Sequence, residues 1–133
     1  MESGNYDIEL TGWNDGVEEA SVIAEDEDFL FYRKKDDKRF VYGIIGKKYI
    51  ASLRPNDEKI AEPVSIPTIN RQYFCGKKVF VELAKEEGLM NGFFDFKDDD
   101  YRDVVIDVFE QHFVRLQYGK EFDTKDITKI EEL

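Results

Sequence analysis

The chain has 133 residues, 41% of them hydrophobic and 14% aromatic, which suffices for one domain with a single core but not comfortably for two. Thirty acidic residues against 19 basic ones give a formal charge of −11, which argues against general attraction to nucleic acid or to anionic membranes. A single cysteine, Cys75, excludes an internal disulfide framework and a cysteine-based zinc cluster.

The first residues show no basic, apolar pattern of a secretory signal, and no apolar run approaches the roughly 20 residues that cross a bilayer. These features predict a cytoplasmic protein with no membrane partner. No repeat or low-complexity tract is apparent.

Charge is unevenly distributed along the chain. Residues 1–28 hold ten acids and no Lys or Arg, residues 29–54 hold eight bases and two acids, and residues 95–133 hold twelve acids and six bases. Two interpretations stay open: the blocks neutralise each other across neighbouring strands, or the surplus acid forms a face for a cationic partner.

The first predicted strands lie between residues 5 and 24. Tyr6, Ile8 and Leu10 alternate with polar residues, which is typical of a strand with one buried face. A turn is predicted at residues 14–16 and a returning strand over residues 17–24.

Residues 29–53 predict a three-stranded meander in which each strand pairs with the next. The expected turns are Asp36-Asp37 and Gly46-Lys47, and the first of these would place Phe31 opposite Tyr42. One face of the meander is expected to form the core, with the other face half covered or available for binding.

A loop is predicted over residues 54–67, which contain all three prolines, and helices are predicted beyond it. One helix is expected over residues 77–87 and a second from Asp98 or Asp99 to about Tyr118, with a short helix in the tail. The β-branched run 104–108 leaves a strand as the alternative for the second helix.

The expected fold is therefore an α+β single domain spanning residues 1–133. An antiparallel meander in the strand-rich part, residues 5–53, would be covered on one face by two or three C-terminal helices from the helix-rich part, residues 68–133.

Catalytic constellations are scarce in this sequence. The lone histidine, His112, falls on the apolar stripe of the second predicted helix, which favours a core-edge structural role. Lys77 and Lys78 could lower the pKa of Cys75, but a Cys75–His112 pair would depend wholly on the fold. We predict no enzyme activity, no cofactor and no catalytic residue, and leave a small metal-dependent hydrolase or nuclease as an alternative.

Five aspartates between residues 95 and 103 raise the question of a metal, but their spacing does not fit a calcium-binding loop. Asp95 and Lys97 have the D-x-K spacing of metal-dependent nucleases, a short and common pattern. The simpler interpretation of Asp98, Asp99 and Asp100 is a helix N-terminus, and no metal site is predicted.

Nucleic acid is an unlikely partner because of the overall charge. The candidate surface would be the basic, aromatic hairpin, through Tyr32, Lys34, Arg39 and Lys48.

The preferred hypothesis is an acidic protein-binding module or inhibitor, of the immunity-protein, antitoxin or DNA-mimic type, that neutralises a basic protein. Its expected contact residues are Glu18, Glu19, Glu25, Asp26, Glu27 and Asp28. Residues 25–28 in particular are expected to lack a structural role. The alternative is an acidic secretion-type chaperone or adaptor, with a homodimer also considered.

Overall fold

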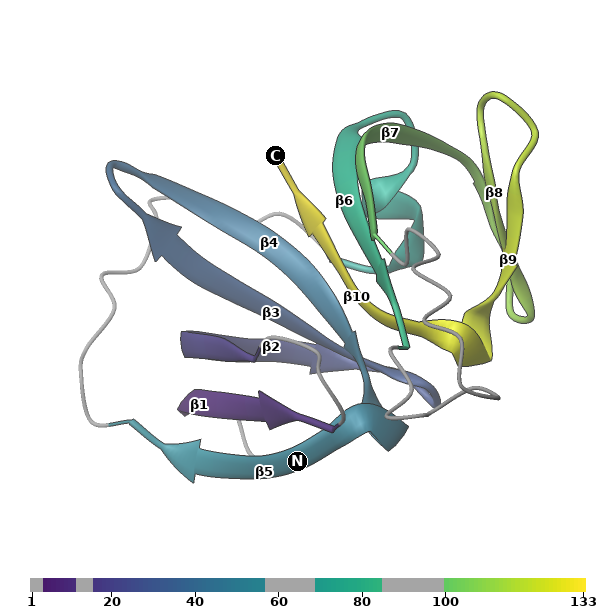
Figure 1. Cartoon of the computed structure of the whole chain (residues 1–133). Helices are drawn as coiled ribbons and strands as arrows, with labels where there is room; N and C mark the ends of the chain where they lie inside the picture. Colours follow the sequence, from purple (N-terminus) through teal and green to yellow (C-terminus); the bar gives the residue numbers. More distant parts are fainter. Residues whose placement is uncertain (1–3, 12–15, 57–68, 85–99) are drawn as a thin grey trace, which may run out of the picture.

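The computed structural model describes residues 4–11, 16–56, 69–84 and 100–133. Within them, ten antiparallel strands form one continuous, strongly curved sheet in the order β5-β1-β2-β3-β4-β10-β6-β7-β8-β9 (Figure 1). The strands are β1 (Gly4–Leu10), β2 (Val17–Glu25), β3 (Phe29–Asp36), β4 (Arg39–Gly46), β5 (Ile50–Pro55), β6 (Lys78–Leu83), β7 (Asp100–Phe109), β8 (Phe113–Leu116), β9 (Glu121–Asp123) and β10 (Ile127–Glu132).

The expected α+β class is wrong, because the described residues contain no α-helix. Their only helical segments are the 3-10 turns η1 (Lys47–Tyr49), η2 (Arg71–Phe74) and η3 (Thr124–Asp126). The segment expected as the second helix forms β7, a turn and β8, and the tail expected as a short helix forms η3 and β10. None of the helical segments in the described ranges is long and apolar enough to span a membrane.

Residues 78–83 of the first expected helix form β6, where Val79 and Val81 are buried and Phe80 between them is half-buried, which is the period of a strand. A bulge explains the error over the second expected helix. In β7 the pairing with β8 shifts register between Ile106 and Val108, so that buried positions fall three apart, as in a helix. The β-branched residues then favour the strand.

The antiparallel strands expected over residues 5–53 are present, but their pairing differs in two ways. The tight turn is Asp37-Lys38, because Asp36 pairs with Arg39, and Phe31 therefore lies opposite Ile44. The last strand of the expected meander, β5, pairs with β1 and not with β4.

The part of the sheet formed by β1–β5 curves so that its two edge strands, β4 and β5, approach each other. Laid flat, four strand spacings of about 4.8 Å would separate β4 from β5 by roughly 19 Å. The four residue steps from Gly46 to Ile50 span at most about 14 Å, so the two edges of this five-stranded group must approach each other. We call this group, residues 4–56, the N-terminal unit.

Strands β6–β10 repeat this arrangement and form the C-terminal unit, residues 78–133. Its strand order, β10-β6-β7-β8-β9, again places the fifth strand beside the first, and η3 again joins the fourth strand to the fifth. The chain therefore contains a structural repeat that its sequence does not reveal.

Four pairs of equivalent backbone hydrogen bonds fix the correspondence between the units. In the N-terminal unit they run from Thr11 N to Tyr49 O, Asp26 N to Phe29 O, Lys47 N to Asp28 O and Asn56 N to Asn5 O. In the C-terminal unit, in the same order, they run from Ala84 N to Asp126 O, Glu110 N to Phe113 O, Thr124 N to His112 O and Leu133 N to Lys78 O. The left-handed backbone at Glu19 (φ 53°) also recurs, at Asp103 (φ 58°).

The units join where β4 pairs with β10, so the fourth strand of one meets the fifth strand of the other. Two cores lie on opposite faces of the sheet. One fills the N-terminal unit and includes Ile8, Leu10, Tyr32 and Ile45. The other fills the C-terminal unit and extends onto the outer face of β3 and β4, where Phe31 lies against Phe74 of η2.

Candidate functional site

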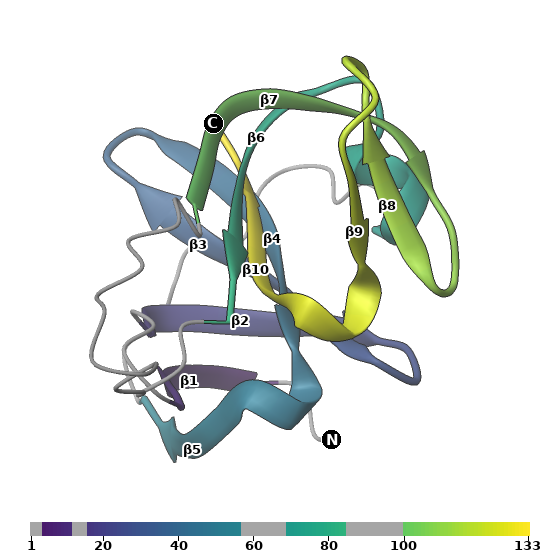
Figure 2. The same cartoon turned by 45° about the vertical axis from the view of Figure 1, so that its right-hand side comes forward.

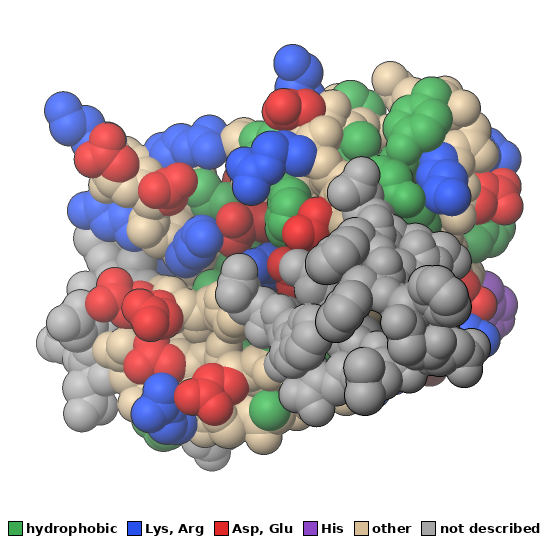
Figure 3. Space-filling view, viewed as in Figure 1, with side chains coloured by type: hydrophobic (Ala, Val, Ile, Leu, Met, Phe, Trp, Pro, Cys, Tyr) green, Lys and Arg blue, Asp and Glu red, His purple; other side chains and the backbone are tan. Residues whose placement is uncertain are grey.

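The outer surface of β1 and β2 carries acidic side chains, which gather at the lower left of Figure 3. We call Asp7, Glu9, Glu18 and Glu19 the acidic face. Asp7 accepts hydrogen bonds from the backbone N–H of Glu19 and from the side chain of Asn56, both at 2.9 Å. These bonds, the first above all, lower the pKa of Asp7.

One cation from β5 accompanies these acids. Arg54 lies 3.3 Å from the Glu9 carboxylate, and the Ser52 hydroxyl donates to the same group at 3.2 Å. Arg54 and Ser52 therefore hold the Glu9 side chain at the β5 side of the acidic face.

The corresponding surface of the C-terminal unit is a pocket of about 460 Å³, which we call the β6–β7–β10 pocket. It is lined by Phe80, Glu82, Asp100, Arg102, Lys129, Glu131 and Leu133. By the hydrogen-bond correspondence, Glu82 occupies the place of Glu9, and Arg102 occupies the place of Glu18. In Figure 3, charges of both signs gather between the β3–β4 hairpin and β6–β7.

Glu82 and Lys129 are nearly fully buried in this pocket, with 2% and 8% of their surface exposed. The Thr128 hydroxyl donates to the Glu82 carboxylate at 3.3 Å and to the Glu82 backbone carbonyl at 3.0 Å. The Lys129 ammonium lies 4.0 Å from the Glu82 carboxylate, an ion pair longer than a hydrogen bond.

Glu131 links the two units across the β4–β10 joint. Its Oε1 accepts a 2.6 Å hydrogen bond from the Tyr32 hydroxyl and lies 3.0 Å from the Lys34 ammonium. Burial raises the pKa of Tyr32, and the Glu131 carboxylate raises it further. The Tyr32 ring crosses Gly43, where a Cβ would lie 2.4 Å from it, so only glycine permits this contact.

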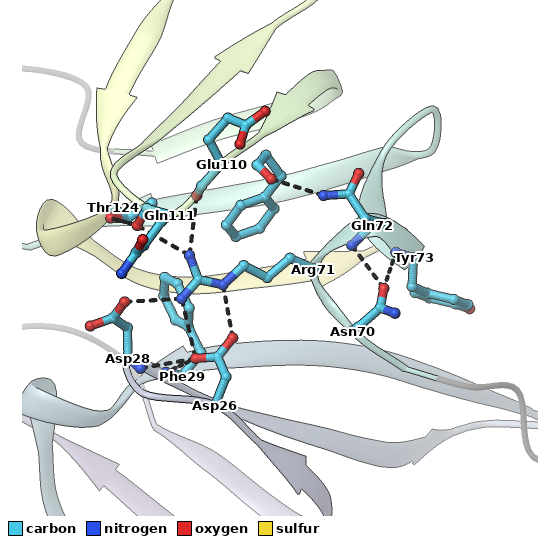
Figure 4. A network of polar contacts seen from close by, with 11 residues as sticks. Asp26, Asp28, Phe29, Asn70, Arg71, Gln72, Tyr73, Glu110, Gln111 and Thr124 are labelled. Atoms are coloured by element: carbon cyan, nitrogen blue, oxygen red, sulfur yellow. Dashed lines mark hydrogen bonds and ion pairs between the residues drawn. The ribbon is translucent and has the colours of Figure 1, made fainter.

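The acidic turn Glu25–Asp28 has a structural role that its sequence does not suggest. Arg71 of η2 donates from Nε to Asp26 at 2.8 Å and from Nη2 to Asp28 at 2.9 Å. Its Nη1 donates to the backbone carbonyls of Glu110 and Gln111 in the corresponding turn of the C-terminal unit (Figure 4). Arg71 thus connects the β2–β3 turn to the β7–β8 turn.

The Asp26 side chain also stabilises the β2–β3 turn, because its Oδ1 accepts hydrogen bonds from the backbone N–H groups of Asp28 and Phe29, both at 2.9 Å. Burial raises the pKa of Asp26, but hydrogen bonds from Arg71 and from these two N–H groups outweigh burial and lower it. Glu25 lies 3.3 Å from Lys47. The expectation that residues 25–28 have no structural role is therefore wrong, whereas their contact with a partner stays a prediction.

An open pocket of about 920 Å³ lies where the β2–β3 and β7–β8 turns meet η1 and η3. The segments η1 and η3 lie close together in both Figure 1 and Figure 2. The Tyr49 hydroxyl bonds the Lys125 carbonyl at 2.5 Å across it. Many of its charges are paired internally: Asp28 with Arg71, Lys47 with Glu25, and Lys125 with Asp123. Such a balanced lining selects no particular ligand charge.

The candidate nucleic-acid surface is not assembled. Tyr32 is completely buried and Lys34 is paired with Glu131, so neither is available for stacking or for phosphate. Lys48 lies in η1, over the Tyr49 ring, whereas Arg39 lies at the tip of the β3–β4 hairpin.

His112 is exposed in the β7–β8 turn, so the expectation of a core-edge histidine is wrong. Burial and the nearby Asp107 raise the pKa of Cys75, the opposite of what a thiolate nucleophile needs. No group of metal-binding side chains occurs among the described residues. Asp95, Lys97, Asp98 and Asp99 lie outside them, and Asp100 begins a strand rather than a helix.

No protein-family model, curated protein or solved structure matches this chain.

Proposed function

We propose that the protein is a binding module that engages a cationic segment of a protein partner through the acidic face. The observation that carries the proposal is the gathering of four carboxylates, Asp7, Glu9, Glu18 and Glu19, on the outer surface of β1 and β2, of which Glu9 is paired with Arg54. A basic partner would be steered to this surface and would find ionised acceptors there.

The acidic face includes two of the contact residues expected from sequence, Glu18 and Glu19. The other expected residues, 25–28, contribute less to this proposal because Arg71 and Lys47 already neutralise three of their carboxylates. An inhibitory role follows in the same proposal, since covering a basic surface would prevent it from binding a polyanion.

Apolar capture of an unfolded protein has less support. Among the described residues, Tyr118 and Leu133 are the exposed large hydrophobic side chains. A chaperone surface would need a larger contiguous apolar patch.

The test is association of the full chain with a short poly-L-lysine peptide, measured by surface interferometry at about 0.05 M and about 0.3 M salt. The double variant Glu18→Gln/Glu19→Gln should reduce the association rate by about tenfold at low salt, and by much less at high salt.

A matched control is Asp36→Asn/Asp37→Asn, which removes the same charge from the exposed tip of the β3–β4 hairpin. If the control slows association as much as the double variant does, net charge alone acts and the acidic face is not the site. Circular dichroism of all three proteins establishes that they are equally folded.

A further inference from the structure

We propose that Arg33 is the centre of a separate site that binds a single carboxylate group at the outer face of the β3–β4 hairpin. This site is independent of the acidic face and prefers the opposite charge.

Arg33 lies in the middle of a row of side chains that crosses three strands. It pairs with Ser21 of β2 on one side and with Tyr42 of β4 on the other. Residues directly opposite each other in antiparallel strands point to the same face, so these three side chains are neighbours. The face is the one on which Phe31, two residues earlier in β3, lies against Phe74.

The guanidinium of Arg33 is buried without a hydrogen-bond acceptor. Only 3% of the residue is exposed, and its Nε and Nη1 atoms are enclosed with no acceptor among the described residues. The other buried charged side chains in the described ranges, Glu82 and Lys129, lie 4.0 Å from each other. Leaving an enclosed cation without an acceptor costs stability, and an anion that supplies the acceptor would recover that cost on binding.

The strand arrangement does not itself require a buried cation at this position. Phe29 and Phe113 correspond through equivalent backbone hydrogen bonds, which places Gln117 of the C-terminal unit in the position of Arg33. Gln117 is exposed and uncharged. The buried guanidinium is therefore particular to the N-terminal unit, which favours a binding role over a structural one.

The carboxylate beside this row is already engaged. Oε1 of Glu132 accepts a hydrogen bond from the backbone N–H of Tyr42, and its Oε2 accepts one from the Tyr73 hydroxyl, both at 2.9 Å. Lys35, two residues beyond Arg33 on the same face, is exposed and forms no ion pair within the described part of the chain. An approaching anion would thus be attracted by Lys35 and bound by Arg33.

Access to the enclosed donors involves Phe40. The Arg33 guanidinium lies 5.1 Å from the centre of the Phe40 ring, and this ring is half-buried next to the exposed tip of the hairpin. Because Nε and Nη1 are enclosed, an anion reaches them only when a covering side chain moves. The Phe40 ring is the described side chain that can do so without disturbing the core strands.

The surroundings favour a carboxylate over a phosphate. One guanidinium neutralises one negative charge, and the Phe40 ring and the buried Tyr42 side chain solvate additional charge poorly. The second charge of a phosphate would therefore be penalised. A carboxylate could come from an acidic side chain of another protein or from a free organic acid.

The experiment is thermal unfolding of the full chain, followed by intrinsic fluorescence, at an ionic strength held constant with sodium chloride. The probes are acetate, N-acetylaspartate methylamide, its uncharged asparagine analogue and inorganic phosphate. At about ten times the dissociation constant, the two carboxylates should each raise the unfolding midpoint by roughly 4–6 °C. We expect no rise with the asparagine probe and weaker binding of phosphate.

Arg33→Met should abolish the rise that the carboxylates produce. Without ligand, this variant should unfold at the wild-type midpoint or above it, because replacing an unpaired buried charge by an apolar side chain does not cost stability. Arg33→Lys should retain binding that is about tenfold weaker. Arg39→Met is the matched control, since it removes the same charge from the exposed tip of the hairpin, and it should keep the wild-type rise.

The wild type supplies a second measurement that needs no substitution. The NMR signal of the Arg33 Nε–H should shift saturably with acetate, with the dissociation constant that the unfolding experiment gives. Tighter binding of the aspartate probe than of acetate identifies a protein side chain as the natural source, and equal affinity identifies a free organic acid.

Four results would each overturn the assignment: no saturable shift of the Nε–H signal, an equal rise in Arg33→Met, tighter binding of phosphate, or a lower midpoint of ligand-free Arg33→Met. The last would mean that the folded chain itself already stabilises the guanidinium. None of these outcomes depends on the acidic face, so this site and the proposed function fail or survive separately.

Discussion

The two units share one strand order but differ in how their interiors are completed. The N-terminal unit encloses its own core, centred on Ile8, Tyr32 and Ile45. The core of the C-terminal unit also includes Phe29 and Phe31 from the first unit and Phe74 of η2. One topology thus yields a self-contained unit and a unit that depends on its neighbour.

The contrast extends to corresponding residues. At the end of the second strand, the N-terminal unit has the exposed Glu25 where the C-terminal unit has the buried Phe109. Phe109 meets Phe29 edge to face, with ring centres 5.8 Å apart. The C-terminal unit is therefore bound to the first through aromatic contacts that the first does not need for its own interior.

The largest expected effect comes from this pair of positions. Phe109→Ala should lower the free energy of unfolding by about 3–5 kcal/mol, because it leaves a cavity where the units meet. Glu25→Ala, the same truncation at the corresponding place, should change it little, since that side chain is exposed. Urea denaturation measures both, and similar losses would contradict the difference between the units.

The next effect concerns the connection between the two turns. Arg71→Gln should cost about 2–3 kcal/mol, because it breaks charged hydrogen bonds to Asp26 and Asp28 and the contacts with two backbone carbonyls. Glu27→Gln is the control in the same turn, and no loss of unfolding free energy is expected from it. A loss as large as that of Arg71→Gln would show that the turn depends on its total charge rather than on this connection.

The same variant changes the pH dependence of stability. Because the pKa of Asp26 is lowered in the folded state, its contribution is complete above the unfolded value of about 3.9 and disappears as the pH falls through the lowered pKa. Unfolding followed by fluorescence below about pH 4 should therefore show a shallower acid-induced loss in Arg71→Gln than in the wild type. Equal slopes would mean that other carboxylates dominate acid unfolding.

The smallest effect tests the β4–β10 joint. Gly43→Ala should cost about 1–2 kcal/mol, because its Cβ would collide with the Tyr32 ring. The C-terminal unit has Leu116 in place of Tyr32, so Tyr32→Leu should relieve the collision. In a double-mutant cycle, the second substitution should make Gly43→Ala less costly, and additive losses would contradict the proposed collision.

The sequence by itself determined the antiparallel strands of the first half and the absence of a disulfide framework. Alternating residues such as Ile8 and Leu10 bury one face of a strand whatever its partner is, so local pattern suffices there. The exposure of Glu18 and Glu19 was also predictable, since unpaired charged side chains are rarely buried, whereas their contact with a partner stays a prediction.

Strand partners required the tertiary structure. Nothing near β5 in the sequence indicates that it pairs with β1, because that pairing follows from the curl imposed by η1. Strand β7 was hidden by a bulge that spaces its buried residues, Ile106 and Phe109, as a helix does.

The charged contacts were decided by the tertiary structure for the same reason. Arg71 reaches Asp26 across 45 residues, and the Tyr32 hydroxyl reaches Glu131 across 99, distances over which sequence spacing carries no signal. The pocket around Arg102 and Lys129 exists because β7, β6 and β10 become neighbours in the sheet. Local periodicity determines which side chains face inward, whereas only the closed arrangement of strands decides which charges meet.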